Sequence, residues 1–404
     1  MSAMSIYWTL LYAFMFSTVL TGLLITPARA LGWVDQPTTR KHHSHPVPLV
    51  GGVAMCAAFC GTLWLLPDKP AGYLALLTGM VALALIGAYD DLRHIRPSIR
   101  LVLQAAVVLL AMVWGDRWLT NLGDLMGYGA IALASFALPF TLFGMVGIIN
   151  AFNLVDGLDG LAGGLALIAA GWLAVLCLTA PVPDLKAAIT LLALAAVLAG
   201  FLAWNLRHPW RQRASVFMGD AGSTLLGFAL SWFLVDLSQG ERAVMAPITA
   251  IWILALPLLD TVAVMIRRLR AGRSAFAADR QHLHHLLLTT GLSDAKVTAI
   301  LLAIALITGA VGAAARWLHV PEYLQFGAFL VLSLLYYHAT TRYWTRQQAI
   351  AITPEWEHDR RRCVIKSMQP WLNSEPRLNP VRASTHRGTA SRKTKATDAA
   401  DLLQ

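Results

Sequence analysis

The chain has 404 residues, of which 57% are hydrophobic and 13% are charged, and its mean hydropathy is +0.58. Soluble globular proteins carry about 25% charged residues, so this composition excludes that class and indicates a chain that crosses a membrane several times. The formal net charge of +10 does not predict nucleic-acid binding, because the basic residues gather in the loops between apolar segments and in the C-terminal tail.

Apolar stretches close to the length of about 20 residues that a membrane-spanning helix needs recur along the chain. We place them at roughly 5–26, 48–66, 71–88, 100–115, 129–149, 162–180, 186–204, 223–236, 244–264, 297–315 and 324–340. The sequence therefore predicts an all-α, polytopic integral membrane protein with about eleven transmembrane helices. The first apolar run lacks a basic start and a small-residue cleavage site, so we expect a retained span rather than a signal peptide.

Lysine and arginine are unevenly divided between alternate loops. One set of loops holds Lys69, Arg117, Lys186, Arg242 and Arg316, and every other basic residue lies in the second set or in the tail. Because basic loops stay in the cytoplasm, we expect the N-terminus outside the cytoplasm and the C-terminus inside it. Residues 1–340 are predicted to form the transmembrane domain, and residues 341–404 a basic, largely disordered cytoplasmic tail.

Unusual polar residues cluster on the predicted cytoplasmic side. In "DQPTTRKHHSHPVPLVGG", residues 35–52, Arg40 and Lys41 can donate charge-assisted hydrogen bonds to phosphate, or can simply anchor the second span. Asp90 and Asp91 end the third span, where buried charge is costly. We therefore expect these two carboxylates to meet a cation, with an exposed loop start as the alternative.

The stretch "NAFNLVDGLDGLAGG", residues 150–164, carries Asn150, Asn153, Asp156 and Asp159 at intervals of three. On an unbroken helix each step of three turns the side chain by about 60°, so the four cannot all face one small ligand. The glycines favour a broken helix, and broken backbone at membrane depth must line a protein-enclosed, wet cavity. The alternative is a polar loop with a helix N-cap.

The stretch "ASVFMGDAGSTLLGF", residues 214–228, places Asp220 between glycines just before an apolar span. An acidic side chain there would repel a bare phosphate but can hold one through a bridging Mg²⁺ ion. Phe217 can stack on a flat ring, although a lone phenylalanine more often packs in a core.

The stretch "SAFAADRQHLHHLLLTTG", residues 274–291, carries Arg280 and three histidines. On a helix His282 and His285 would share a face and His284 would point elsewhere. No Glu or Cys completes a metalloprotease zinc pattern, so we interpret the histidines as phosphate donors, with an amphipathic surface helix as the alternative. Asp260, inside an apolar span, is expected to pair with Arg267 or Arg268.

Together these clusters offer carboxylates and amides for a hard divalent cation, and Arg, Lys and His for phosphate. That combination is typical of metal-assisted phosphoryl transfer. Because the clusters lie at the membrane boundary, one substrate is expected to be a lipid phosphate and the other a soluble nucleotide-type donor.

In this order, the clusters resemble the polyprenyl-phosphate N-acetylhexosamine-1-phosphate transferases over nearly all of residues 1–340. "DRQHLHHLL" and "DQPTTRK" are more similar to the bacterial branch that transfers GlcNAc 1-phosphate to undecaprenyl phosphate than to the phospho-MurNAc-pentapeptide branch. The resemblance implies a multi-pass protein of the bacterial inner membrane, with its N-terminus in the periplasm. It also implies initiation of cell-surface glycan synthesis, such as O-antigen in lipopolysaccharide biosynthesis, and allows a homodimer.

The resemblance further implies that the lipid phosphate attacks the β-phosphorus of UDP-GlcNAc, giving undecaprenyl-diphospho-GlcNAc and UMP. The implied metal ligands for Mg²⁺, or alternatively Mn²⁺, are Asp220, Asn153 and Asp91. The implied catalytic residues are Asp90, Asp91, Asp156, Asp159 and Asp220. The implied nucleotide- and phosphate-binding residues are Asn150, Asn153, Asp156, Asp159, Phe217, Lys41, Arg40, Arg280, His282, His284 and His285. The basic residue expected shortly after the double aspartate is Arg93 or Arg96.

Two alternatives remain open at this point. The donor can be another UDP-N-acetyl-sugar of the GalNAc, FucNAc or QuiNAc type, because the sugar contacts cannot be located from one sequence. A transporter of lipid-linked sugars is the more distant alternative. It predicts charges near the bilayer midplane and internal repeats, whereas here the polar residues gather at one face.

Overall fold

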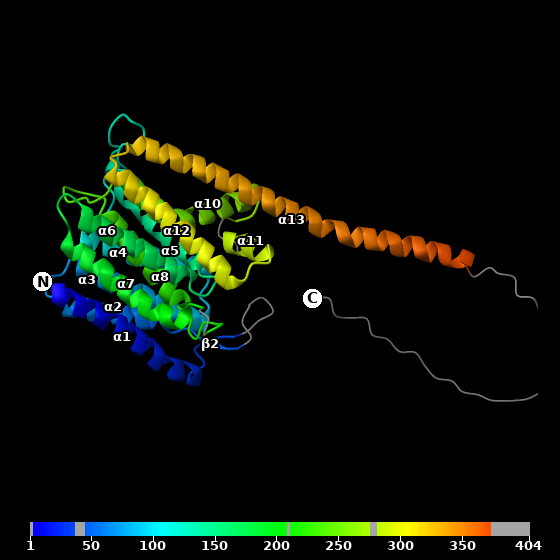
Figure 1. Cartoon of the computed structure of the whole chain (residues 1–404), viewed down its shortest axis with the longest axis horizontal. Helices are drawn as coiled ribbons and strands as arrows, with labels where there is room; N and C mark the ends of the chain where they lie inside the picture. Colours follow the sequence, from blue (N-terminus) through cyan, green and yellow to red (C-terminus); the bar gives the residue numbers. More distant parts are fainter. Residues whose placement is uncertain (1–2, 37–44, 208–210, 275–280, 373–404) are drawn as a thin grey trace, which may run out of the picture. The chain divides into compact units, whose positions relative to one another are not determined.

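The computed structural model describes residues 3–36, 45–207, 211–274 and 281–372, with side chains described up to residue 347. Contacts within the chain divide it into two units, Met1–Thr345 and Arg346–Gln404. The division falls inside the last helix, so the first unit is treated by itself below. It is a bundle of helices running side by side (Figure 1), with one two-stranded antiparallel sheet in which Val34 pairs with Pro48.

The helices and strands follow one another in a simple order. They are α1 (Ala3–Ala30), β1 (Val34–Asp35), β2 (Val47–Pro48), α2 (Gly51–Leu65), α3 (Tyr73–Arg93), α4 (Pro97–Gly115), the 3₁₀ helix η1 (Ala134–Phe136), α5 (Ala137–Val155), α6 (Leu161–Thr179), α7 (Leu185–Asn205), α8 (Gly219–Asp236), α9 (Pro247–Ile253), α10 (Ala255–Arg270), α11 (Leu283–Thr289), α12 (Asp294–Trp317) and α13 (Glu322–Leu372).

The all-α, polytopic class is confirmed, and each predicted apolar stretch coincides with helix. Within the described residues, seven helices are long and apolar enough to cross a membrane, or eight if α9 and α10 form one broken span bent by 82°. The count of about eleven spans is therefore not confirmed: α2 has only 15 residues, and α8 carries Asp220 and Asp236 at its ends. α13 continues to Leu372 and so includes part of the tail that was predicted to be largely disordered; residues 373–404 lie outside the description.

Helix α8 forms the centre of the bundle. Every residue from Ala221 to Val235 is buried, as expected for a helix that is apolar on all sides. It packs against α2, α3, α5 and α6. Glycines allow two of these approaches at its first turn: a Cβ on Gly52 would lie 2.1 Å from the Gly222 nitrogen, and a Cβ on Gly87 would lie 2.4 Å from the Ala221 nitrogen.

Candidate active site

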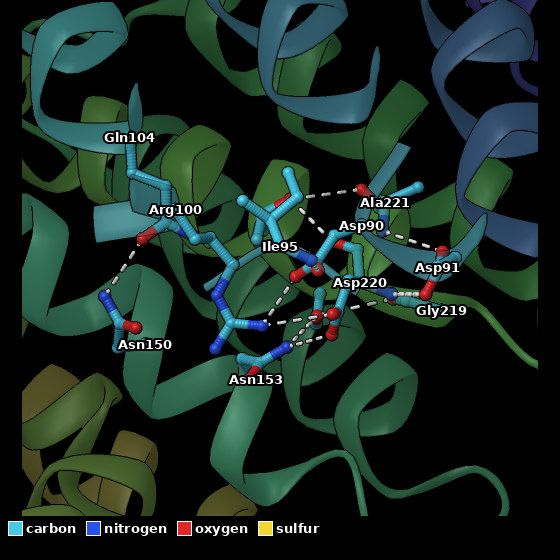
Figure 2. A network of polar contacts seen from close by, with 12 residues as sticks. Asp90, Asp91, Ile95, Arg100, Gln104, Asn150, Asn153, Gly219, Asp220 and Ala221 are labelled. Carbon is cyan, nitrogen blue, oxygen red and sulfur yellow. Dashed lines mark hydrogen bonds and ion pairs between the residues drawn. The ribbon is translucent and has the colours of Figure 1, made fainter. Parts of the chain in front are cut away.

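The end of α3, the start of α4, the end of α5 and the start of α8 bring their polar side chains together at one end of the bundle (Figure 2). At the centre, Nη1 of Arg100 lies 2.9 Å from Oδ2 of Asp90 and 3.1 Å from Oδ2 of Asp220. The backbone N–H of Ile95 donates to the other oxygen of Asp90 at 2.6 Å. The expected cation beside the double aspartate is thus a guanidinium group, which offsets the cost of burying Asp90.

Asp91 faces the first turn of α8. Its Oδ1 accepts a hydrogen bond from the Asp220 N–H at 2.9 Å, and its Oδ2 accepts one from the Ala221 N–H at 3.4 Å. A carboxylate at a helix N-terminus satisfies N–H groups that have no partner within the helix. These contacts help to position Asp220, and the predicted role of Asp91 as a metal ligand stays a prediction.

Helix α5 contributes two amides to the site. Nδ2 of Asn153 donates to Oδ1 of Asp220 and, at 3.1 Å, to the hydroxyl of Ser223. Nδ2 of Asn150 instead donates to Oε1 of Gln104 at 3.2 Å. Of the two, only Asn153 therefore contacts Asp220 directly, while Asn150 ties α5 to α4.

The helix breaks where the glycines predicted. α5 ends at Val155, α6 begins at Leu161, and Gly160 has a φ of +80°. Asp159 pairs with an arginine that follows α7: its Oδ2 lies 2.6 Å from Nε of Arg207, which also contacts Asp294 at 2.8 Å. These contacts anchor the loop between α5 and α6, and the predicted catalytic and nucleotide-binding role of Asp159 stays a prediction.

Asp156 lies in the same loop and faces the carboxylate centre. Its side chain is exposed to solvent. Desolvation, reinforced by the negative charges of Asp220, Asp91 and Asp159, raises the pKa of Asp156 to about 8. A carboxyl group in this position gains from a nearby cation, because positive charge lowers the cost of ionising it.

The histidine segment is held by a buried acid. Nδ1 of His282 lies 2.7 Å from Oδ2 of Asp260, whose Oδ1 accepts hydrogen bonds from the Leu283 N–H and the Tyr336 hydroxyl. The expected pairing of Asp260 with Arg267 or Arg268 was wrong: Arg267 donates to Thr340 and to the Gln281 carbonyl.

His282 is not part of the helix, so helical spacing did not predict its neighbours. It is the residue preceding α11, and its ring stacks on that of His284 with centroids 5.7 Å apart and planes within 7°. A Cβ on Gly157 would lie 2.5 Å from Nε2 of His284. Burial and the neighbouring His285 and His282 lower the pKa of His284 to about 3. His284 is therefore a neutral ring against the loop that carries Asp156.

Several predicted residues cannot be placed at the site. Arg40, Lys41 and Arg280 lie outside the described residues. Phe217 is half-buried, and its backbone pairs with the start of α2, since its carbonyl accepts the Gly51 N–H at 3.0 Å and its own N–H donates to the Pro48 carbonyl at 2.9 Å. This ladder fixes the loop before α8.

The side chains around Asp220 offer part of a donor set for a divalent ion. Among the residues that the structure describes, no group of three or more His, Cys, Asp or Glu side chains is arranged to hold a metal ion. Mg²⁺ is commonly bound through one or two carboxylates together with water and substrate phosphates, so Asp220, Asn153 and Asp156 suffice as a partial donor set. The ion pair between Arg100 and Asp220 shows that a cationic group is accommodated beside this carboxylate.

The sequence reasoning missed three residues that hold the site together. Arg100 takes the place expected for Arg93 or Arg96, and Arg207 anchors Asp159. Asn205 accepts a hydrogen bond from the Gly160 N–H at 2.8 Å and donates to the Val216 carbonyl at 2.8 Å, so it connects two loops. Asn205 is a polar residue at the end of a long apolar run, and this feature of the sequence could have identified it as a site residue.

Residues 73–238 match the model of Glycosyl transferase family 4. The chain is also similar to curated proteins named undecaprenyl-phosphate alpha-N-acetylglucosaminyl 1-phosphate transferase. The protein of that name from Escherichia coli O157:H7 is 37% identical over 345 residues, which cover 85% of this chain and 93% of the relative. The one from Yersinia pestis is 35% identical, covering 85% and 94%, and the one from Haemophilus influenzae is 36% identical, covering 84% and 94%.

Proposed function

The chain belongs to Glycosyl transferase family 4, alongside the undecaprenyl-phosphate alpha-N-acetylglucosaminyl 1-phosphate transferases, and from that premise we propose that it transfers N-acetylglucosamine 1-phosphate from UDP-GlcNAc to undecaprenyl phosphate. It is a multi-pass enzyme of the bacterial inner membrane. The observation that carries the proposal is the meeting of Asp90, Arg100, Asn153 and Asp220 at one end of the bundle.

The reaction exchanges one phosphorus–oxygen bond for another. An oxygen of the lipid phosphate forms a bond to the β-phosphorus of UDP-GlcNAc, and the bond from that phosphorus to the bridging oxygen breaks. UMP leaves with the electron pair and undecaprenyl-diphospho-GlcNAc remains. A phosphate monoester is already ionised at neutral pH, so the protein's task is to bring two anions together rather than to remove a proton.

The residues divide this task by their charges. Arg100 offers a guanidinium at the junction of Asp90 and Asp220, where it can meet a phosphate oxygen. Asp220 and Asn153, with Asp156, would hold Mg²⁺, which when bound supplies the positive charge that draws the donor's pyrophosphate to these acids. Asp91 and Ser223 keep Asp220 and Asn153 in place.

An apolar cavity of about 380 Å³ lies beside the histidine segment. It is formed by α10, α11, α12 and the part of α13 before residue 345, and includes Leu256, Leu286 and Tyr336. Tyr336 also donates to Asp260. We assign this cavity to the polyprenyl chain, because an apolar wall next to the buried Asp260–His282 pair suits a lipid whose phosphate must reach the carboxylate centre.

The distribution of basic residues supports an orientation with the carboxylate centre in the cytoplasm. Arg93, Arg96, Arg100 and Arg207 lie at this end of the bundle, whereas Arg117 pairs with Asp236 at the opposite end. Under the positive-inside rule, the N-terminus would then be periplasmic and the C-terminus cytoplasmic. Cytoplasmic access is also what a soluble nucleotide donor requires.

The identity of the UDP-sugar donor is tested with purified protein in nanodiscs containing undecaprenyl phosphate. The protein is incubated separately with UDP-GlcNAc, UDP-GalNAc and a UDP-6-deoxy-N-acetyl-sugar, and the lipid product is identified by mass spectrometry. The proposal expects product mainly from UDP-GlcNAc. Product from a 6-deoxy donor alone would overturn the choice of sugar while leaving the transferase class intact.

A further inference from the structure

The outer surface of α3 and α4 carries an open groove of about 550 Å³ that the proposed reaction does not use. Leu85 and Tyr89 form the α3 wall, and Ile99 and Leu103 form the α4 wall. In each helix the two residues are four apart, so each helix presents one stripe to the groove. All four side chains are exposed and apolar or aromatic, as expected for a surface that faces lipid.

One end of the groove is strongly basic. Arg93, at the end of α3, and Arg96, just before α4, both line it and both are exposed. Neither guanidinium has an ion pair or hydrogen bond with the residues that the structure describes. Arg100, a few residues further on, in contrast forms ion pairs with Asp90 and Asp220 through its Nη1. The groove therefore combines an apolar wall with two uncompensated positive charges at one end.

This pattern matches the outline of a membrane lipid. Tyrosine side chains favour the level of the headgroups, and Tyr89 lies one helical turn before Arg93 and one after Leu85 along α3. Arginine recognises phosphate oxygens through its planar set of N–H donors. The basic end lies at the same end of the bundle as the carboxylate centre, which is where the inner-leaflet headgroups meet the protein.

We propose that the groove between α3 and α4 binds one anionic phospholipid of the inner leaflet, with its phosphate between Arg93 and Arg96 and an acyl chain along Tyr89, Ile99 and Leu103. The bound lipid stabilises the turn between α3 and α4. Ile95 lines the groove, and its N–H donates to Asp90 at 2.6 Å, so the lipid sits beside the peptide that holds this carboxylate.

The contacts favour a resident phospholipid over the lipid substrate. Asp90 is only 4% exposed, and both of its oxygens are already used by Ile95 and Arg100. Arg100 contacts Asp220 of α8 and Gln104 contacts Asn150 of α5 (Figure 2), and neither residue lines the groove. The turn between α3 and α4 thus separates a phosphate held by Arg93 and Arg96 from Asp220, where the reaction is placed.

The test measures lipid binding without any transfer reaction, so it does not depend on the proposed function. Full-length protein in detergent is titrated with phosphatidylglycerol or with phosphatidylcholine of the same acyl chains, and bound lipid is counted by native mass spectrometry. We expect one phosphatidylglycerol to bind preferentially and to raise the melting temperature. The double variant Arg93→Gln/Arg96→Gln should weaken its binding by about tenfold or more, since charge-assisted hydrogen bonds are lost.

Matched variants separate this site from general charge and general lipid contact. Arg29→Gln/Arg273→Gln removes two exposed arginines elsewhere on the same predicted face and should leave binding unchanged. Ile99→Trp, which fills the groove, should displace the lipid, whereas Val102→Trp, outside its lining, should not.

Three results would overturn the proposal. The first is equal binding of the two phospholipids by the wild type. The second is a Arg93→Gln/Arg96→Gln variant that binds phosphatidylglycerol like its matched control. The third is one-for-one displacement of phosphatidylglycerol by added undecaprenyl phosphate, which would make the groove a substrate site.

Discussion

Replacing Arg100 with glutamine should both destabilise the protein and stop the reaction. Its guanidinium lies 2.9 Å from a carboxylate oxygen of Asp90, whose side chain is 5% exposed, and 3.1 Å from one of Asp220, which is 29% exposed. Removing one partner of a buried ion pair costs about 3–5 kcal/mol. Because the Arg100 side chain is itself 22% exposed, solvent screens the ion pair, and we expect Arg100→Gln to lower the free energy of unfolding by about 2–3 kcal/mol.

The assay is thermal unfolding in detergent, combined with a double-mutant cycle. Arg29→Gln, which removes an exposed arginine at the end of α1, is the control and should change stability by less than about 0.5 kcal/mol. Asp90→Asn removes the charge that Arg100 balances, so the Arg100→Gln/Asp90→Asn variant should be less destabilised than the two single losses added together. Equal stability of the Arg100→Gln and Arg29→Gln variants, or strict additivity in the cycle, would refute the reasoning.

Three further predictions test the packing and the titrating groups around this centre. Gly87→Ala should destabilise the protein by about 1–3 kcal/mol and lower activity, because the added Cβ would collide with the first turn of α8. Gly144→Ala should be neutral in the same melting assay, because no atom lies within 4 Å of the position of its Cβ. Asp156→Asn should raise the melting temperature in metal-free buffer. Since the pKa of Asp156 in the folded state, about 8, lies above its unfolded value, this gain should be absent near pH 4 and grow up to about pH 8. An equal gain at pH 4 and pH 8 would contradict the prediction. His284→Asn should reduce the stability that the protein loses when the pH falls below about 6.5. The His284 ring has a pKa of about 3 in the folded state, so the unfolded state binds a proton that the folded state does not. An unchanged dependence of stability on acid pH would argue against a buried neutral ring.

The sequence predicted the helices well because apolar length is a local property. The break after Asn153 was also predicted, since glycine marks backbone that leaves the helix. Arg100 was not identified because its contact with Asp90 depends on the turn between α3 and α4. α3 ends at Arg93, the chain then reverses, and the first turn of α4 brings Arg100 back to Asp90. Distance along the chain therefore gave no indication of the contact.

The histidine segment shows a second limit of sequence reasoning. Helical spacing was applied to His282, but this residue precedes α11 and has extended backbone, so it stacks on His284. Asp260 was paired with the nearest arginines along its own helix, whereas its partner comes from the segment that follows. Both errors concern tertiary contacts of polar residues, which carry no periodic signal.

The most direct test of the central claim is the stoichiometry of the reaction in wild-type and Asp220→Asn protein. Purified protein in nanodiscs is given undecaprenyl phosphate, UDP-GlcNAc and MgCl₂, and lipid product and UMP are measured in the same sample. The account predicts one UMP for each undecaprenyl-diphospho-GlcNAc, dependence on Mg²⁺, and loss of both products in Asp220→Asn. Undiminished turnover in that variant, or without divalent metal, would contradict a reaction centred on Asp220.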